Sequence, residues 1–352
     1  MIDEIRDVDL VIIGAGIAGL SLAFRAVQNN LNVVLVDDRR NGATYSATGL
    51  LAPRLDYILH DIDLVRISDF QCPRWKILFP EIVVPKQFLI PIDPCHRRKF
   101  SCIEILLKNY DRITPLRRKH LPESSKIPHS ILEKMEPNLR HSYFDGALSF
   151  WEHTVDPQQL LREFSSLIDE FLSCLKLQVG PESIRFETAD KKIKAVYFKT
   201  KRGDNIKISS SRKPIVIINA AGPWIQNIVA PLGINLGIEL HLGIQMSVPG
   251  YFFQNGIITF DEKGKYCICL PKGNFLQVGP TNTLFTGHPN NIKVLPEDLE
   301  KLFATLKSIL DPGIQVSKFE LLKAGLRVKP KFGDTNRPII WSHYANGFKN
   351  FY

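Results

Sequence analysis

The stretch VIIGAGIAGL, residues 11–20, decides the fold. The run DLVII that leads into it predicts a buried parallel strand, and the run LSLAFRAVQNN that follows has the apolar spacing of a helix. Gly14, Gly16 and Gly19 form a G-x-G-x-x-G pattern between these two elements. The first glycine permits a tight turn, the second lets a pyrophosphate approach the helix N-terminus, and the third allows close helix–sheet packing. The stretch therefore predicts a dinucleotide-binding strand, turn and helix.

A second predicted strand, LNVVLVDD at residues 31–38, ends in two carboxylates. Asp37 lies 18 residues after Gly19, at the strand tip where a carboxylate accepts hydrogen bonds from both ribose hydroxyls. A 2′-phosphate would be repelled there, which argues against NADP. This motif alone is compatible with both FAD and NAD.

A later apolar run, PIVIINAAGPW at residues 214–224, helps to decide between them. It predicts a strand that ends in Ala221-Gly222. In flavoproteins of this fold, a late strand with such an end returns the chain beside the first glycine loop. The simpler alternative is a core strand followed by a glycine turn. Together with the position of the first motif near residue 10, this run favours FAD.

The chain between these segments predicts a second body. Asp156-Pro157 is a helix start with proline in the first turn, and Pro296 opens another helix over residues 296–310. Residues 193–212 alternate like a hairpin that turns at Arg202-Gly203-Asp204, and residues 239–283 are rich in strands. We expect these later strands to form an antiparallel sheet that lies over the flavin.

The predicted fold class is therefore α/β, with a Rossmann-type FAD-binding domain and a discontinuous α+β substrate domain built on an antiparallel sheet. The chain crosses between the two bodies several times. The expected ranges are FAD-binding at 1–90 and 161–235, substrate or cap region at 91–160, substrate domain at 236–320, and an incomplete return to the FAD-binding domain at 321–352.

Composition and charge limit the location and partners. The net charge of +9 suggests an anionic partner, either a small phosphate or carboxylate or a membrane surface. The acidic start MIDEIRDVD is no signal peptide, and the longest apolar run is shorter than the roughly 20 residues that a membrane span needs. The six cysteines show no framework spacing, and Cys267 and Cys269 lack the partners of a zinc site. We expect a cytoplasmic chain that is at most peripheral on the inner membrane face.

The basic residues gather at positions 96–120, where a helix with one apolar stripe is predicted. Such a helix can lie on an anionic bilayer, which would suit an enzyme that passes electrons to membrane quinone. The alternative is that the stripe packs on the substrate domain and the charges are solvated. Nucleic acid is a poor partner because the cluster has no reader motif. The stripe consists of Phe100, Ile103, Leu106, Leu107, Tyr110 and Ile113.

Across nearly its whole length the sequence resembles the FAD-dependent D-amino-acid-oxidase superfamily, and within it most closely the FAD-dependent glycerol-3-phosphate dehydrogenases. The segments that carry the resemblance are GAGIAG, GALSFWEHTVDPQQLL, INAAGPWIQNI, FLQVGPTNT and KAGLRVKP. The resemblance implies hydride transfer to FAD from a small anionic alcohol, with glycerol 3-phosphate oxidised to dihydroxyacetone phosphate. It implies that FAD is bound by Gly14, Gly16, Gly19, Asp37, Asp38, Ser46, Thr48, Ala221 and Gly222.

The resemblance places Arg327, in KAGLRVKP, over the flavin, where it grips the phosphate or carboxylate of the substrate. A fixed guanidinium makes two parallel charge-assisted bonds to such an anion. Lys329 and Arg54 would extend the positive pocket, with Arg54 as a second catalytic residue. The alternative for Arg327 is an ordinary surface salt bridge.

Three departures from the dehydrogenase pattern keep other functions open. Ala52 stands where those enzymes carry a histidine, and TGLLAP and VDPQQLL look more like glycine and sarcosine oxidases. The family also continues past GFKNFY, whereas this sequence stops at Tyr352, so we expect a fragment or an incomplete pocket. Oxidation of an alcohol needs a base for the hydroxyl proton, for which His153 and His343 are candidates, but oxidation of a neutral amine does not. The alternatives are an amine or amino-acid oxidase and a non-catalytic flavin-binding remnant.

Overall fold

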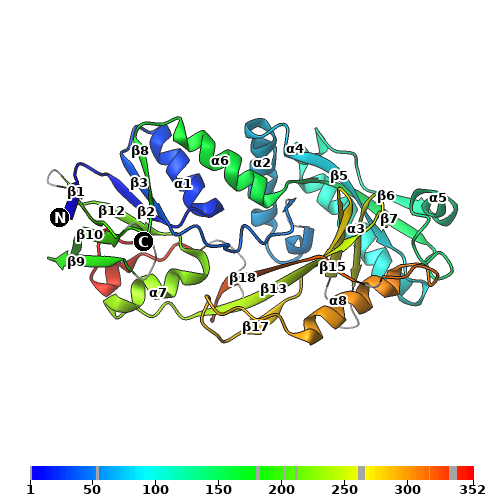
Figure 1. Ribbon diagram of the computed structural model, residues 1–352. Coiled ribbons are helices and arrows are strands. Elements are labelled where there is room, and N and C mark those ends of the chain that lie inside the picture. Colours follow the sequence, from blue (N-terminus) through cyan, green and yellow to red (C-terminus); the bar gives the residue numbers. More distant parts are fainter. Residues whose placement is uncertain are drawn as a thin grey trace.

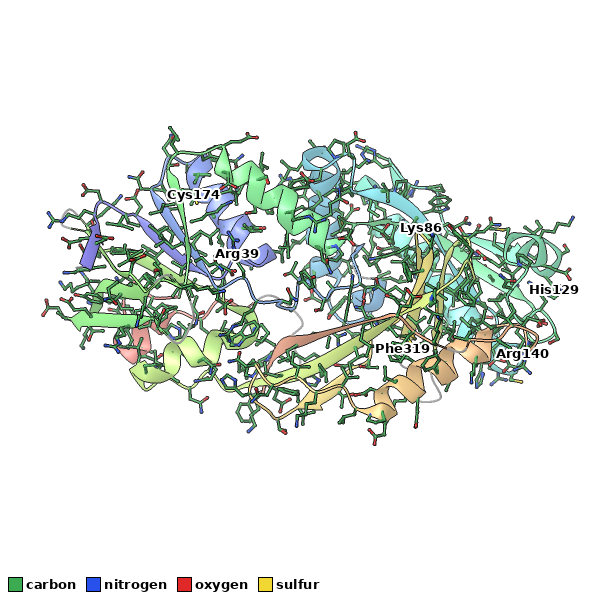
Figure 2. The ribbon with its side chains drawn as sticks, in the orientation of Figure 1. Arg39, Lys86, His129, Arg140, Cys174 and Phe319 are labelled. Atoms are coloured by element: carbon green, nitrogen blue, oxygen red, sulfur yellow. The ribbon has the colours of Figure 1, made fainter. Side chains whose placement is uncertain are left out.

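The structure, a computed structural model, describes residues 2–52, 55–179, 183–201, 203–210, 213–260, 266–316, 318–332 and 339–352. Its described part consists of two bodies that lie side by side (Figure 1). The first body holds two four-stranded sheets and both labelled chain ends, and the second is built on a ten-stranded sheet. Figure 2 shows Cys174 in the first body and His129 and Arg140 at the far end of the second.

The first body contains a parallel sheet with the strand order β12-β2-β3-β8. Its strands are β2 (Leu10–Ile13), β3 (Val33–Asp37), β8 (Cys174–Gln178) and β12 (Val216–Asn219). Helices α1 (Ile17–Gln28) and α6 (Pro157–Asp169) cover one face, where the rings of Phe24 and Phe164 meet edge to face at 5.6 Å. Asp156 caps α6 by accepting from the amides of Gln158 and Gln159, which confirms the predicted helix start.

A second four-stranded sheet covers the other face, so the central parallel strands β2 and β3 are buried on both sides, as their continuous apolar runs predict. Its order is β1-β11-β10-β9, and β10 and β11 form the predicted antiparallel hairpin. Arg202 in the hairpin turn lies outside the described residues. The strands are β1 (Ile2–Ile5), β9 (Arg185–Ala189), β10 (Lys192–Lys199) and β11 (Asn205–Ser209).

The second body is the large sheet, with the order β17-β13-β16-β15-β14-β5-β7-β4, with β18 on β13 and β6 on β7. The pairs are antiparallel as predicted, except that β14 and β5 run parallel. The strands are β4 (Leu50–Leu51), β5 (Val84–Pro91), β6 (Ser125–Pro128), β7 (Gly146–Thr154), β13 (Ile238–Pro249), β14 (Gly256–Phe260), β15 (Tyr266–Lys272), β16 (Phe275–Gly279), β17 (Thr283–Phe285) and β18 (Leu321–Pro330).

Helices cover both faces of the large sheet. Helix α8 (Pro296–Ile309) buries Leu302, Leu306 and Ile309 on one face, and its range agrees with the predicted helix. Helix α3 (Arg97–Ile113) packs on the other face with α2 (Ile62–Leu78) and α4 (Pro115–Arg118) nearby. The remaining helices are α5 (His129–Met135) beside β6 and β7, and α7 (Ile225–Val229) after β12.

The observed α/β architecture confirms the predicted fold class. The chain passes several times between the two bodies, and the long strands β13 and β18 run from the middle of the molecule into the second body (Figure 1). The domain ranges expected from the sequence stay a proposal. Strand β5 crosses the expected boundary at residue 90, and β18 pairs with β13 along its whole length within the large sheet.

Candidate active site

The glycine loop after β2 is packed too tightly for any side chain at two of its positions. Gly14 has a φ of +107°, and a Cβ there would lie 2.4 Å from the carbonyl oxygen of Ala220. A Cβ on Gly19 would lie 1.7 Å from the carbonyl oxygen of Gly14. Both contacts are far inside van der Waals distance, so the loop, helix α1 and the end of β12 can pack together only around glycine.

Gly16, by contrast, faces open space at the N-terminus of α1. The atom nearest to a Cβ at this position would be Thr44 Oγ1, at 3.5 Å. Within the described residues, no side-chain hydrogen bond caps the helix at Gly16. Thr44 Oγ1 accepts a hydrogen bond from the Ile17 amide at 3.3 Å. Room beside the backbone amides of the first turn is what a pyrophosphate needs at a helix N-terminus. The sequence analysis did not identify Thr44, because a lone threonine in a loop carries no spacing signal.

Asp37 holds the glycine loop from the tip of β3. Its Oδ2 accepts from the Ala15 amide at 2.7 Å, and its Oδ1 accepts from the Arg39 amide at 2.6 Å. Burial raises the pKa of Asp37 above its ordinary value, while the two amides act in the opposite direction. The carboxylate therefore lies beside the loop, where a ribose would be expected. Asp38 instead forms an ion pair with Arg40.

The end of β12 lies beside the glycine loop. β12 pairs in parallel with β2, and the Ala220 amide donates to the carbonyl oxygen of Ile13 at 2.8 Å. Ala221 follows, and Gly222 has a φ of +56° where the chain turns into a short 3-10 helix. This is the return of the late strand that the sequence predicts. Gly222 also lines the main cavity.

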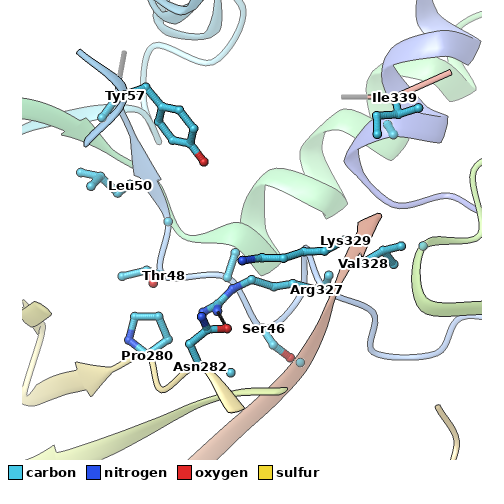
Figure 3. Close-up of a pocket in the computed structure, with 18 of the residues that line it drawn as sticks. Ser46, Thr48, Leu50, Tyr57, Pro280, Asn282, Arg327, Val328, Lys329 and Ile339 are labelled. Atoms are coloured by element: carbon cyan, nitrogen blue, oxygen red, sulfur yellow. Dashed lines mark hydrogen bonds between the residues drawn. The ribbon is translucent and has the colours of Figure 1, made fainter. Parts of the chain in front are cut away.

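A cavity of about 1280 Å³ is lined by Ala18 and Leu22 of α1, by Gly222 after β12 and by residues of the large sheet, and its lining does not include Gly14, Gly16, Gly19 or Asp37. Ser46, Thr48, Gly222 and Arg327, four of the residues assigned from the sequence, line it together (Figure 3). A large part of the cavity wall is apolar, and its residues include Leu55, Ile58, Leu59, Ile90, Ile103, Leu106, Phe150, Ile258, Phe260 and Ile268. The volume lies above the usual range for a small-molecule site, so the cavity has room for more than one ligand group.

Ser46 and Thr48 hold the loop after β3 against the large sheet. The hydroxyl of Ser46 donates to the carbonyl oxygen of Ala324 at 2.7 Å, and the Gln245 amide donates to Ser46 O at 3.0 Å and to Thr48 Oγ1 at 3.2 Å. A Cβ on Gly325 would lie 2.7 Å from Ser46 Cβ, so the loop and β18 are in direct contact. This arrangement joins the two bodies at the cavity.

Arg327 reaches the cavity from β18 with its guanidinium held in place. Nη1 donates to Asn282 Oδ1 at 3.0 Å, and Nη2 donates to the carbonyl oxygen of Thr281 at 3.2 Å. A Cβ on Gly243 would lie 2.8 Å from Nη2, so glycine leaves room for the side chain on β13. Lys329 extends beside Arg327 into the same space (Figure 3). Two cations on one strand thus line the cavity.

The two histidines considered for the catalytic base occupy different places in the structure. Ala52 lines the cavity, but Arg54, two residues further on, lies outside the described residues. His343 lines the cavity and His153 does not. Burial lowers the pKa of both imidazoles and favours their neutral forms.

Helix α3 packs its apolar stripe into the protein. Phe100, Leu107 and Tyr110 are buried. For these three residues the stripe packs on the protein, as the alternative interpretation expected, and is not available to a bilayer. Lys99, from the basic cluster, lines the cavity with its Nζ 4.0 Å from the ring centre of Phe260. Among the described residues, no helix is long and apolar enough to cross a membrane.

The basic cluster also contains a buried residue, although the sequence analysis expected its charges either on a bilayer or in solvent. Arg117 is 2% exposed and forms ion pairs with Asp111 at 2.7 Å and Glu152 at 3.2 Å. Glu152 lines the cavity, and the sequence analysis missed it. A glutamate inside the apolar strand GALSFWEHT was the available signal.

Comparison with known proteins agrees with this geometry. The family model described as FAD dependent oxidoreductase matches residues 9–352. The chain is 25% identical to an alpha-glycerophosphate oxidase of Streptococcus pneumoniae and 23% identical to an aerobic glycerol-3-phosphate dehydrogenase of Staphylococcus saprophyticus. Each match covers 92% of this chain, but 54% and 58% of the relatives. The chain thus spans about half the length of the curated relatives it matches.

Solved structures show the same fold. The glycerol-3-phosphate dehydrogenase from Bacillus halodurans, complexed with FAD, has a TM-score of 0.70 at 18% identity, covering 92% of this chain and 57% of that one. The L-proline dehydrogenase from P. horikoshii has a TM-score of 0.72 at 18% identity, covering 99% and 87%.

FAD fits the residues of this site. At Gly16 a Cβ would meet only Thr44 Oγ1 at an ordinary contact distance, which leaves room for a pyrophosphate, and Asp37 lies at the tip of β3 beside the glycine loop. The cavity is lined by Ala18 and Leu22 of the same helix α1 and by the large sheet. The family model spans almost the entire chain and requires the same cofactor. The chain belongs to the family of FAD-dependent oxidoreductases.

Proposed function

We propose that this chain oxidises a small anionic alcohol, glycerol 3-phosphate, to dihydroxyacetone phosphate. The observation that carries the proposal is the guanidinium of Arg327, oriented by Asn282 and Thr281 at the cavity wall, with Lys329 beside it. Two neighbouring cations suit a phosphate dianion better than a single carboxylate. FAD, when bound, supplies the acceptor for the hydride.

In this proposal each group of residues has a separate role. Arg327 and Lys329 bind the phosphate and orient the carbinol carbon, and Arg54 adds positive charge. The amides at the start of α1 bind the pyrophosphate of FAD, and Asp37 accepts from its ribose hydroxyls. Ser46, Thr48 and Gly222 form the flavin side of the cavity, and Asp38 and Ala221 are assigned to FAD binding as well.

The names of the relatives support the substrate. Both curated relatives are named for glycerol phosphate, and their similarity covers nearly all of this chain. The excess of positive charge, +9 over the whole sequence, also favours an anionic substrate. A membrane surface and a quinone acceptor remain predictions from the sequence.

A second candidate is the oxidation of an amine or amino acid. Ala52 supplies no base, and a neutral amine needs none, because its lone pair drives loss of the hydride. The apolar part of the cavity wall, which includes Ile103, Phe150 and Ile268, also suits a substrate with a hydrocarbon group. A non-catalytic flavin-binding protein is the third possibility.

The test is anaerobic reduction of the protein-bound flavin, which is monitored through the loss of visible absorbance of the flavin. We expect glycerol 3-phosphate to bleach the flavin and glycerol to do so far more weakly, because glycerol lacks the phosphate. Bleaching by glycine, sarcosine or proline, with none by glycerol 3-phosphate, would replace the proposal with the amine oxidase. No bleaching by any of them would favour the non-catalytic protein.

A further inference from the structure

Glu152 is a buried carboxyl group in the wall of the cavity. It lies on β7, two residues after Phe150, so both side chains belong to the same face of the strand, and both line the cavity. Glu152 is 1% exposed. Its Oε1 accepts from the hydroxyl of Tyr110 at 2.6 Å and pairs with Nε of Arg117 at 3.2 Å.

The second oxygen of this carboxyl group is left without a partner. Oε2 of Glu152 is buried and makes no hydrogen bond within the described part of the chain. Buried carboxylate oxygens are nearly always satisfied, since an unmade hydrogen bond costs free energy. An unsatisfied oxygen on a residue that lines a ligand cavity indicates that the ligand supplies the missing donor.

The sheet register brings Glu152 to the position where the sequence lacks a base. β4 pairs antiparallel with β7 through Leu50 opposite Thr154 and Leu51 opposite His153. One further step along the same register puts Ala52 next to Glu152, and both residues line the cavity. Ala52 is the residue that stands where the dehydrogenase motif has histidine. The neighbouring strand therefore offers a carboxylate at the place where the motif is missing its imidazole.

The charges around Glu152 leave it able to exchange a proton near neutral pH. Burial raises the pKa of Glu152 to about 7, Arg117 and the Tyr110 hydroxyl lower it, and Asp111 raises it. Arg117 is shared, because its Nη1 also donates to Asp111 at 2.7 Å. Cys72 on α2 is close enough for Glu152 to raise the thiol pKa.

The remaining charged groups near this face are engaged elsewhere. Lys86, opposite Glu152 in the β5–β7 register, donates through Nζ to the carbonyl oxygen of Gln254 at 2.8 Å. Asp69 on α2 accepts from the amides of Leu116 and Arg117. The pKa of Glu152 is therefore governed mainly by its own burial, by Arg117 and by the Tyr110 hydroxyl, with a smaller contribution from Asp111.

We propose that Glu152 is the proton acceptor of the oxidation, an inference that rests on the proposed function. The O–H bond of the substrate breaks and its proton passes to Oε2 of Glu152. The electron pair of that bond forms the carbonyl π bond as the C–H bond breaks, and the hydride, with two electrons, leaves to the FAD. The substrate is oxidised by two electrons, and the proton later returns to water.

The first test is the Glu152→Gln variant, which keeps the shape and cannot accept the proton. We expect substrate to reduce its flavin about 10²- to 10⁴-fold more slowly than in the parent, with the flavin spectrum and the affinity for glycerol 3-phosphate unchanged. Glu136→Gln is the matched control. Glu136 is equally buried, but it accepts from the amides of Gln254 and Asn255 and does not line the cavity.

The second test starts with a measurement that needs neither flavin nor substrate. Infrared spectroscopy of the flavin-free protein should show a carboxyl band that titrates between pH 6 and 8 and is missing in Glu152→Gln. Tyr110→Phe should move this titration to higher pH, because the phenol stabilises the carboxylate, and the pH midpoint of flavin reduction should move with it. A role limited to structure would not shift the two midpoints together.

The outcomes separate this inference from the proposed function. If no substrate reduces the flavin of the parent, the proposed function fails and the proton transfer falls with it. If the parent is reduced and Glu152→Gln is reduced equally fast, only the role of Glu152 is wrong. Absence of the titrating carboxyl band also overturns the role of Glu152, whatever the activity.

Discussion

At the scale of single residues, the side chain with the most consequences is Arg327. Its guanidinium is held by Asn282 and Thr281 before any ligand arrives, and Gly243 leaves the space that it occupies. Such preorganisation lowers the entropic cost of binding an anion, because the rotamer is already restricted. We therefore expect the residue to contribute to substrate affinity much more than to folding.

Arg327→Ala should raise the apparent substrate constant roughly 30- to 1000-fold, since loss of a charge-assisted pair costs about 2–4 kcal/mol. The flavin spectrum and the melting temperature should change little. Steady-state kinetics and thermal unfolding provide the measurement. Arg66→Ala is the control, because Arg66 on α2 is 61% exposed and pairs only weakly with Asp63 at 3.6 Å. Equal kinetics in both variants would mean that Arg327 does not bind substrate.

Lys272 on β15 offers a second prediction at this scale. Its Nζ donates to the carbonyl oxygen of Thr48 at 3.1 Å, and burial, with a contribution from Lys323, lowers its pKa to about 8. In the unfolded chain the pKa is about 10.4, so between these values the unfolded state binds more protons. Stability should therefore rise from pH 8 to pH 10, by at most about 3 kcal/mol.

Lys272→Met should lose this rise, which urea unfolding at pH 8 and pH 10 would measure. Lys307→Met, at an exposed position on α8, is the matched control. The same rise in Lys272→Met as in the parent would show that other groups cause the pH dependence.

At the scale of elements, two glycines of the β2–α1 unit have different structural roles. Gly19 touches the carbonyl oxygen of Gly14 so closely that only a hydrogen atom fits, and it therefore determines how α1 packs on the sheet. Gly16 has an ordinary φ of −70° and free space beside it, so the protein itself does not require glycine there. A ligand at the helix N-terminus gives the physical reason for glycine at that position.

Gly19→Ala should therefore lower the melting temperature strongly, whereas Gly16→Ala should leave it nearly unchanged and weaken FAD binding by at least tenfold. Differential scanning fluorimetry of the flavin-free chain and flavin titration followed by fluorescence separate the two effects. Unchanged FAD affinity in Gly16→Ala would contradict a pyrophosphate at this helix.

At the scale of the whole molecule, the last residues connect strands from both sheets of the first body. Ile217 on β12 donates to the carbonyl oxygen of Asn350, whose side chain bonds Ile193 and Ile215. Phe351 is fully buried in the core between the sheets. Because His343 and Tyr352 also line the cavity, this segment links the stability of the first body to the shape of the site.

Phe351→Ala should cost about 3–5 kcal/mol in the free energy of unfolding, since it leaves a large cavity in a closed core. Urea denaturation measures it, with Phe332→Ala as the control because Phe332 is 80% exposed. A small effect of Phe351→Ala would mean that the C-terminal segment packs only loosely on the sheets.

The sequence by itself determined the parts of this protein that depend on local order. The strand–glycine–helix unit, the carboxylate at the tip of β3, the return of the late strand and the starts of α6 and α8 were all predictable, because short-range spacing encodes them. The resemblance and the family model then agree on FAD. Basic charge alone was a weaker guide, because it placed Arg117 on a bilayer or in solvent.

Only the tertiary structure decided which distant residues share the cavity. Arg327 and Ser46 line the same cavity because β18 pairs with β13 and packs on the loop after β3, and the hydrogen bond between Ser46 and Ala324 joins residues that are 278 apart in the sequence. Extending the β4–β7 register by one residue puts Ala52 opposite Glu152, and Arg117 is buried together with the carboxylates of Asp111 and Glu152. Strand register, burial and ion pairing between remote segments arise from packing of the whole chain, which no local pattern contains.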